Sequence, residues 1–131
     1  DDDSALATIT KALAHDVPDN NHAAAVVAGV VHLRRGSTDE ARAAFESAVV
    51  AADDLLAKTP GLYGALYVRG LARAGLALIS GGALDEAMGD YRSALAICDA
   101  AGVKRDALRW LDYLRGADAG GRLDALRALL G

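Results

Sequence analysis

Two pairs of adjacent acidic residues could take part in acid–base chemistry. Asp39-Glu40 and Asp85-Glu86 each place two carboxylates side by side along the chain. Both pairs fall where a helix is expected to begin, and the helix dipole stabilises negative charge in a first helical turn. We therefore interpret both pairs as charges that stabilise helix starts rather than as a general acid and base.

Thr59, Ser93 and Cys98 are among the side chains that could act as nucleophiles. None has a histidine beside it in the sequence to activate it, although a catalytic triad does not require proximity in sequence. Cys98 is the only cysteine, so no internal disulfide can form, and a small buried apolar residue is the preferred interpretation. We expect no catalytic residues and no enzymatic activity.

Histidines and glycines could build a metal site or a phosphate site. The three histidines have no paired spacing on one helical face, and no cluster of cysteines or carboxylates surrounds them. A phosphate-binding loop needs a lysine after its second glycine, whereas Gly70-x4-Gly75 is followed by a leucine inside an expected helix. We expect no metal and no cofactor.

Length and composition favour one helical unit. The chain has 131 residues, of which 53% are hydrophobic and only 5% aromatic. Such a length suits one cored domain or a short repeat array. Because the apolar content comes largely from alanine, leucine and valine, closely packed helices are favoured over a sheet sandwich.

Charge and hydropathy restrict the class of partner. A net charge of −4 is unlike that of nucleic-acid binders, which concentrate lysine and arginine on one face. No apolar run reaches the roughly 20 residues that a membrane-spanning helix needs. The sequence opens on Asp1-Asp2-Asp3, unlike the basic start of a signal peptide. We expect a cytoplasmic protein that binds neither nucleic acid nor membranes, and a segment of a longer polypeptide.

An internal repeat organises the chain. Five positions recur in the same order after a constant step of 46 residues, as from Gly29 to Gly75. The first set is Gly29, Gly36, Ala41, Phe45 and Ala48, and the second is Gly75, Gly82, Ala87, Tyr91 and Ala94. Between these positions, apolar residues recur every three to four places, which is typical of amphipathic helices.

The spacing predicts an all-α chain of about seven helices joined by short connections. Their expected ranges are 3–16, 22–35, 38–58, 61–80, 84–100, 104–115 and 122–130. Ser37 and Glu40 form a Ser-x-x-Glu capping box at the start of the third helix, and Gly36 ends the helix before it. Short connections predict that successive helices pack antiparallel as hairpins.

The repeated glycine, alanine and aromatic positions resemble the tetratricopeptide repeat. In that family each repeat pairs a helix A with a helix B, and small residues lie where the two helices cross. By this resemblance Gly29 is the helix A glycine, Gly36 the turn glycine and Phe45 the helix B aromatic, while Gly82 is the turn glycine of the next repeat. The resemblance implies a right-handed superhelix of antiparallel hairpins. The step of 46 residues exceeds the family's usual 34, so helices 38–58 and 61–80 should be elongated, as in repeats of bacterial signalling NTPases and regulators.

The resemblance also implies how the single array is divided. The expected units are a helix B of a preceding repeat in 1–18, repeat 1 in 22–58, repeat 2 in 61–101, and a degenerate repeat or cap in 104–131. The last unit matches less well. Trp110 and Gly121 fit the family pattern, whereas Leu114 stands where glycine is expected and Ala125 lies one place off.

In the resembled family, helix A lines a concave groove that binds a partner. Carried over position by position, the expected partner-binding residues are Val26, Val30, Leu33, Arg69, Ala72, Arg73, Leu76, Ile79, Leu108, Leu111 and Arg115. This groove would be mainly apolar, which suits an amphipathic helix laid along it. The alternative is that these residues pack against neighbouring helices.

Arg69 and Arg73 lie one helical turn apart, so they would form a small positive spot in this groove. A partner with apolar anchors and one or two carboxylates would match it. The alternative is that both arginines pair with nearby acids such as Asp112.

The sequence thus predicts a non-catalytic module for protein–protein interaction, a partner-docking or sensor segment of a larger bacterial protein that binds a protein or peptide. The alternative is a structural role in which the chain associates with itself as a homodimer through its first or last helix.

Overall fold

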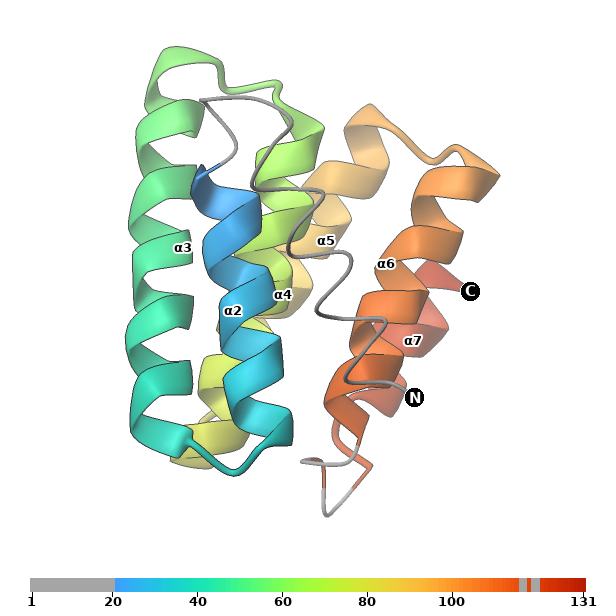
Figure 1. The fold of residues 1–131 in the computed structure, drawn as a ribbon. Helices are drawn as coiled ribbons and strands as arrows, with labels where there is room; N and C mark the ends of the chain where they lie inside the picture. The colour runs from blue at the N-terminus through green and yellow to red at the C-terminus, as the bar shows by residue number, and fades with distance from the viewer. Residues whose placement is uncertain (1–20, 116–117, 119–120) are drawn as a thin grey trace.

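The structure is a computed structural model that describes residues 21–115, 118 and 121–131, and these residues contain six helices and no strand (Figure 1). The helices are α2 (Asn21–Arg34), α3 (Thr38–Lys58), α4 (Tyr63–Ser80), α5 (Asp85–Ile97), α6 (Ala101–Leu114) and α7 (Asp124–Leu130). The all-α prediction is confirmed. The expected helix 3–16 lies outside the described residues, and none of the described helices has the length and apolar character needed to cross a bilayer.

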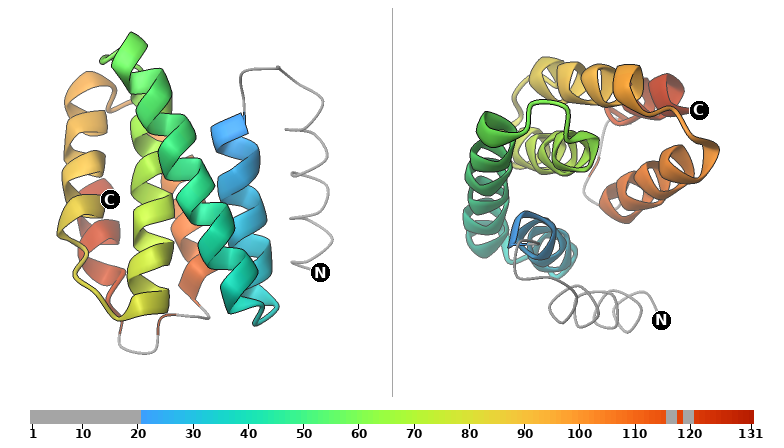
Figure 2. Two further views of the ribbon diagram at one scale, coloured as in Figure 1. Left: turned by 90° about the vertical axis from the view of Figure 1, so that its left-hand side faces the viewer. Right: turned by 90° about the horizontal axis from the view of Figure 1, so that it is seen from above.

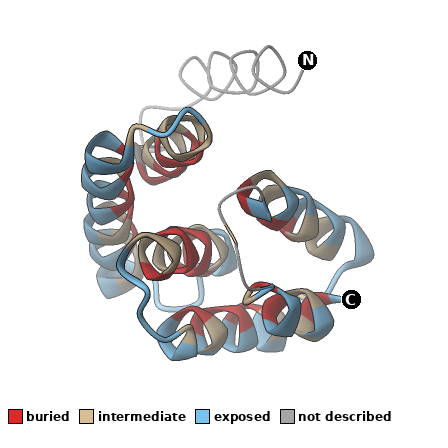
Figure 3. Ribbon diagram, turned by 90° about the horizontal axis from the view of Figure 1, so that it is seen from below, coloured by how far each residue is buried: buried red, intermediate tan, exposed pale blue. Residues whose placement is uncertain are grey.

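Consecutive helices from α2 to α5 run in opposite directions and pack in adjacent pairs (Figure 1). The inner layer consists of α2, α4 and α6, which contact one another, while α3, α5 and α7 lie outside it (Figure 2). Buried residues face the space between the layers, and exposed residues lie on the outer surfaces of α3 and α5 (Figure 3). The right-handed superhelix of a repeat array stays a prediction.

Helix α6 departs from the expected pairing of successive helices. It packs against α2, α4 and α7, whereas its contact with α5 is slight. The three-residue connection explains this difference, because Cys98 and Ala100 adopt extended backbone conformations that lead the chain away from α5. On the inner side, the Arg34 guanidinium donates to the Tyr113 carbonyl at 2.9 Å and lies 5.8 Å from the centre of the Tyr113 ring, which ties α2 to α6.

Two details of the helix ends differ from the expectation. Ser37 precedes α3 as predicted, but its side chain makes no capping hydrogen bond. Its backbone carbonyl instead accepts from the Ala41 N–H at 2.9 Å, so the capping-box prediction is wrong in its side-chain contact. At the end of α4, Gly81 rather than Gly82 adopts the left-handed conformation, with a φ of 75°. Gly81 closes the helix with a 2.8 Å bond to the Ala77 carbonyl.

The ring of Phe45 sets the spacing of three helices. Phe45 is fully buried, and a Cβ added to Gly29 would lie 2.6 Å from its ring. A Cβ added to Gly75 would lie 2.5 Å from the opposite edge of the same ring. Any side chain larger than hydrogen at either position would therefore push α2 or α4 away from α3. The aromatic between hairpins and the small residues at helix crossings, both expected from the sequence, have this role.

The close approach at Gly75 predicts the effect of a single methyl group. Gly75→Ala should lower the free energy of unfolding by about 1–3 kcal/mol, because the core must shift to admit the methyl group. Urea unfolding followed by circular dichroism measures the change.

Gly89 in α5 provides the matched control, because a Cβ there meets nothing within 4 Å. Gly89→Ala should raise stability by up to about 1 kcal/mol, since alanine is the better helix former. Equal effects of the two substitutions would contradict the packing of Phe45 against Gly75.

Candidate functional site

The residues expected to line one groove are divided between the core and two separate surfaces. Val26, Val30, Ala72 and Leu111 are buried in the hydrophobic core, where they pack against neighbouring helices. A further four, Leu33, Leu76, Ile79 and Leu108, are partly buried against this core. Of the expected set, Arg73 and Leu76 line one pocket and Val26 lines another. Helix packing, the alternative left open by the sequence, accounts for the buried members.

Arg69 and Arg73 hold a buried carboxylate. The side chain of Asp90 in α5 is only 5% exposed. Its Oδ1 accepts from Nε and Nη2 of Arg69 at 3.0 and 2.8 Å, and its Oδ2 accepts from Nη1 of Arg73 at 2.9 Å. Both oxygens of the carboxylate are thus satisfied by two guanidinium groups from α4. A buried charge is tolerated when it is paired and hydrogen-bonded in this way.

Two outer carboxylates extend this cluster. Nη1 of Arg69 donates to Asp53 Oδ1 in α3 at 2.7 Å, and Nη2 of Arg73 lies 3.6 Å from Glu86 Oε2. The hydrogen bond to Asp90 raises the pKa of the Arg69 guanidinium, which burial alone would lower. The two arginines therefore face three carboxylates and carry no surplus positive charge toward a partner.

Both arginines pair with nearby acids, the alternative that the sequence left open, but Asp112 is not one of these acids. Asp112 instead pairs with Arg127 and lies 3.8 Å from Arg115, the last of the expected groove residues, which is exposed. The sequence contained a pattern that could have identified Asp90 as the partner of these arginines. Asp90 lies between Ala87 and Ala94 at helical spacing, on the buried face of α5, and a carboxylate there needs a cationic partner from the facing helix.

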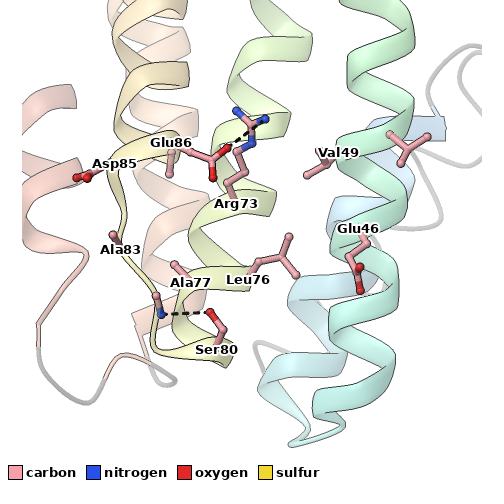
Figure 4. A pocket seen from close by; sticks show the side chains of 12 residues that line it. Glu46, Val49, Arg73, Leu76, Ala77, Ser80, Ala83, Asp85 and Glu86 are labelled. Atoms are coloured by element: carbon pink, nitrogen blue, oxygen red, sulfur yellow. Dashed lines mark hydrogen bonds and ion pairs between the residues drawn. The ribbon is translucent and has the colours of Figure 1, made fainter.

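An open pocket lies between α3 and α5, with α4 at its floor (Figure 4). Its volume is about 690 Å³. We call it the acidic pocket, because it is lined by Glu46, Asp85 and Glu86 and by one cation, Arg73. Arg73 points toward Glu86 in this view and is also bonded to Asp90, so the carboxylates dominate the charge of the pocket.

Apolar side chains complete the acidic pocket. Val49 and Leu76 are partly buried against the core, whereas Val50 is 61% exposed. Val50 is the most exposed of the large hydrophobic residues that the structure describes. An exposed apolar group beside carboxylates marks a surface suited to a partner that carries both apolar and basic side chains.

A second pocket, of about 420 Å³, opens on the inner face between α2, α4 and α6. We call it the inner pocket. Tyr63, Tyr67, Tyr91 and Trp110 line it, together with aliphatic residues that include Val26. Sequence reasoning missed this pocket because it depends on the position of α6, which does not follow from the pairing of successive helices.

The remaining candidates for chemistry and association can also be placed. No group of three or more His, Cys, Asp or Glu residues in the described part of the chain could hold a metal ion. In and before α7, Leu123, Leu126 and Leu130 are buried in the core, so the apolar face of this last helix packs within the chain. The first expected helix, the other candidate for dimerisation, lies outside the described residues.

Comparison of the chain with protein-family profiles, with curated protein sequences and with solved structures found no match. The resemblance to the tetratricopeptide repeat therefore stays a prediction from the sequence.

The buried carboxylate predicts a large loss of stability when its charge is removed. Asp90→Asn should lower the free energy of unfolding by about 2–4 kcal/mol, because two partly buried guanidinium groups lose their shared anion. Chemical denaturation measures the change.

Asp53→Asn is the control, because Asp53 binds the same Arg69 guanidinium but its side chain is 49% exposed. This substitution should cost less than about 1 kcal/mol. A loss at Asp53 as large as that at Asp90 would contradict the assignment of Asp90 as the central anion.

Proposed function

We propose that this chain is a non-catalytic module for protein–protein interaction, and that the acidic pocket binds an amphipathic helix of its partner. The observation that carries the proposal is that the exposed Val50 side chain lines the same pocket as three carboxylates and Leu76. Burial of such a side chain by a partner contributes about 1.5–3 kcal/mol. An apolar stripe with flanking charges is the pattern by which grooves recognise amphipathic helices.

The contacts of the arginines change the class of partner that the sequence alone suggested. A positive spot made of Arg69 and Arg73 would favour an acidic ligand. In the structure both guanidinium groups are held by Asp90, and the outer carboxylates Asp53 and Glu86 add negative charge beside them. The proposed partner helix therefore carries lysine or arginine beside its apolar residues.

The geometry of the pocket also supports a helix rather than an extended strand as the bound segment. Residues of α3 and α5 form its two walls, and residues of α4 form its base (Figure 4). The described residues contain no strand edge to which an extended peptide could add. A partner helix could pack one of its faces against the side chains that α3, α4 and α5 present in the pocket.

A matched pair of synthetic helices tests the proposal. Both peptides have leucines along one face, and their flanking residues are lysine in one and glutamate in the other. Fluorescence anisotropy should show tighter binding of the lysine peptide, and added salt should weaken this binding, because the rim of the pocket is acidic.

Two apolar variants locate the binding surface. Val50→Ser should weaken the lysine peptide by about tenfold, the loss expected when one buried valine is removed from the interface. Ile97→Ser is the matched control, because Ile97 is also exposed, at 48%, but lines neither pocket. Tighter binding of the glutamate peptide, or equal losses in the two variants, would refute the proposal.

A further inference from the structure

The inner pocket is built differently from the acidic pocket. Three of the four tyrosines of the chain and its only tryptophan, Trp110, line it. Its volume of about 420 Å³ falls within the range of pockets that enclose small organic molecules. Aromatic side chains provide large rigid surfaces for contact with such a ligand.

The aromatic wall is held in place by its own contacts. The Tyr67 hydroxyl donates to the Cys98 carbonyl at 3.0 Å, which joins α4 to the end of α5. The Tyr67 ring lies 6.4 Å from the ring of Tyr63 in an edge-on arrangement and 6.0 Å from that of Tyr91. A wall fixed in this way is formed before a ligand arrives, which lowers the entropic cost of binding.

Tyr91 is the third tyrosine of this wall and the most buried. Its side chain lines the pocket, yet the residue is only 1% exposed. Within the part of the chain that the structure describes, the Tyr91 hydroxyl has no hydrogen-bond partner, in contrast to that of Tyr67. Burial also raises the pKa of the Tyr91 hydroxyl, so the group keeps its proton and can donate. A hydroxyl that has no partner within the protein is free to donate to an acceptor on a ligand in the pocket that it lines.

The charges at the pocket indicate an uncharged ligand. The charged residues that line it are Asp106 and Arg109, both on α6 and both exposed. Arg109 Nη2 lies 3.6 Å from Asp106 Oδ1, so the two charges offset each other at the rim. Neither a cationic nor an anionic molecule would find an unpaired opposite charge there.

We propose that the inner pocket binds a small, uncharged, largely apolar molecule that accepts one hydrogen bond, through a carbonyl or ether oxygen, from the Tyr91 hydroxyl. This site lies on the inner face, apart from the acidic pocket, and shares no lining residue with it. The inference does not depend on the proposed protein partner, and either can fail without the other.

Two probes of nearly equal shape test the inference, 2-acetylnaphthalene and 2-isopropenylnaphthalene. They differ in a carbonyl oxygen that the second replaces with a methylene group. Binding is measured by calorimetry, and Trp110 emission reports its location, because Trp110 is the only tryptophan and lines the pocket. The ketone should bind about fivefold more tightly than the hydrocarbon and should change the Trp110 emission.

Tyr91→Phe should abolish the preference for the ketone, because it removes the donor and keeps the ring. Tyr113→Phe is the matched control and should leave the preference intact, since Tyr113 contacts Trp110 with a ring distance of 5.2 Å but does not line the pocket. Circular dichroism confirms that each variant is folded. The inference is overturned if neither probe binds, or if binding leaves the Trp110 emission unchanged. It is also overturned if the unsubstituted chain binds both probes equally well, or if the preference for the ketone survives Tyr91→Phe.

Discussion

The carboxylate of Asp90 is buried in α5, and a buried anion requires cations that reach it with good geometry. Arg69 and Arg73 meet this requirement from α4, and Arg69 also binds Asp53 of α3. One cluster thus connects three helices. Replacement of such clusters by apolar residues can preserve or even raise stability, so we assign it a role in fixing the relative register of α3, α4 and α5 rather than in adding stability. It also influences the charge of the acidic pocket, because Asp90 neutralises Arg73, the one arginine that lines it.

The spacing of the same helices depends on a second contact. Phe45 lies between Gly29 and Gly75. Because neither glycine has a side chain, the backbones of α2 and α4 approach the Phe45 ring of α3 closely. The two pockets lie on opposite sides of this packed unit. The acidic pocket follows from the separation of α3 and α5 above α4, and the inner pocket from the placement of α6 across α2 and α4. The arrangement of the helices thus determines both the close packing around Phe45 and the two pockets.

Local patterns predicted much of the fold and little of the site. Periodicity predicted the six helices of the described residues to within a few residues, and 38–58 matches α3 at both ends. The roles of Gly29, Gly75 and Phe45 followed from residue size. The buried partner of Arg69, Asp90, lies 21 positions away in another helix, and only tertiary packing brings the two together. The position of α6 depends on the extended backbone at Cys98, which no residue type in the connection requires. Both pockets follow from such non-local contacts.

The central claim is that Arg69 and Arg73 serve the fold and leave the partner surface acidic. The most direct measurement is the side-chain Nε–H signal of Arg69 in a nuclear magnetic resonance spectrum, identified by its loss in Arg69→Lys. Because this group donates to the buried Asp90 carboxylate at 3.0 Å, we expect the signal to exchange slowly with solvent and to stay unchanged when an acidic peptide is added. A signal that exchanges rapidly and shifts on titration with the acidic peptide would contradict the account.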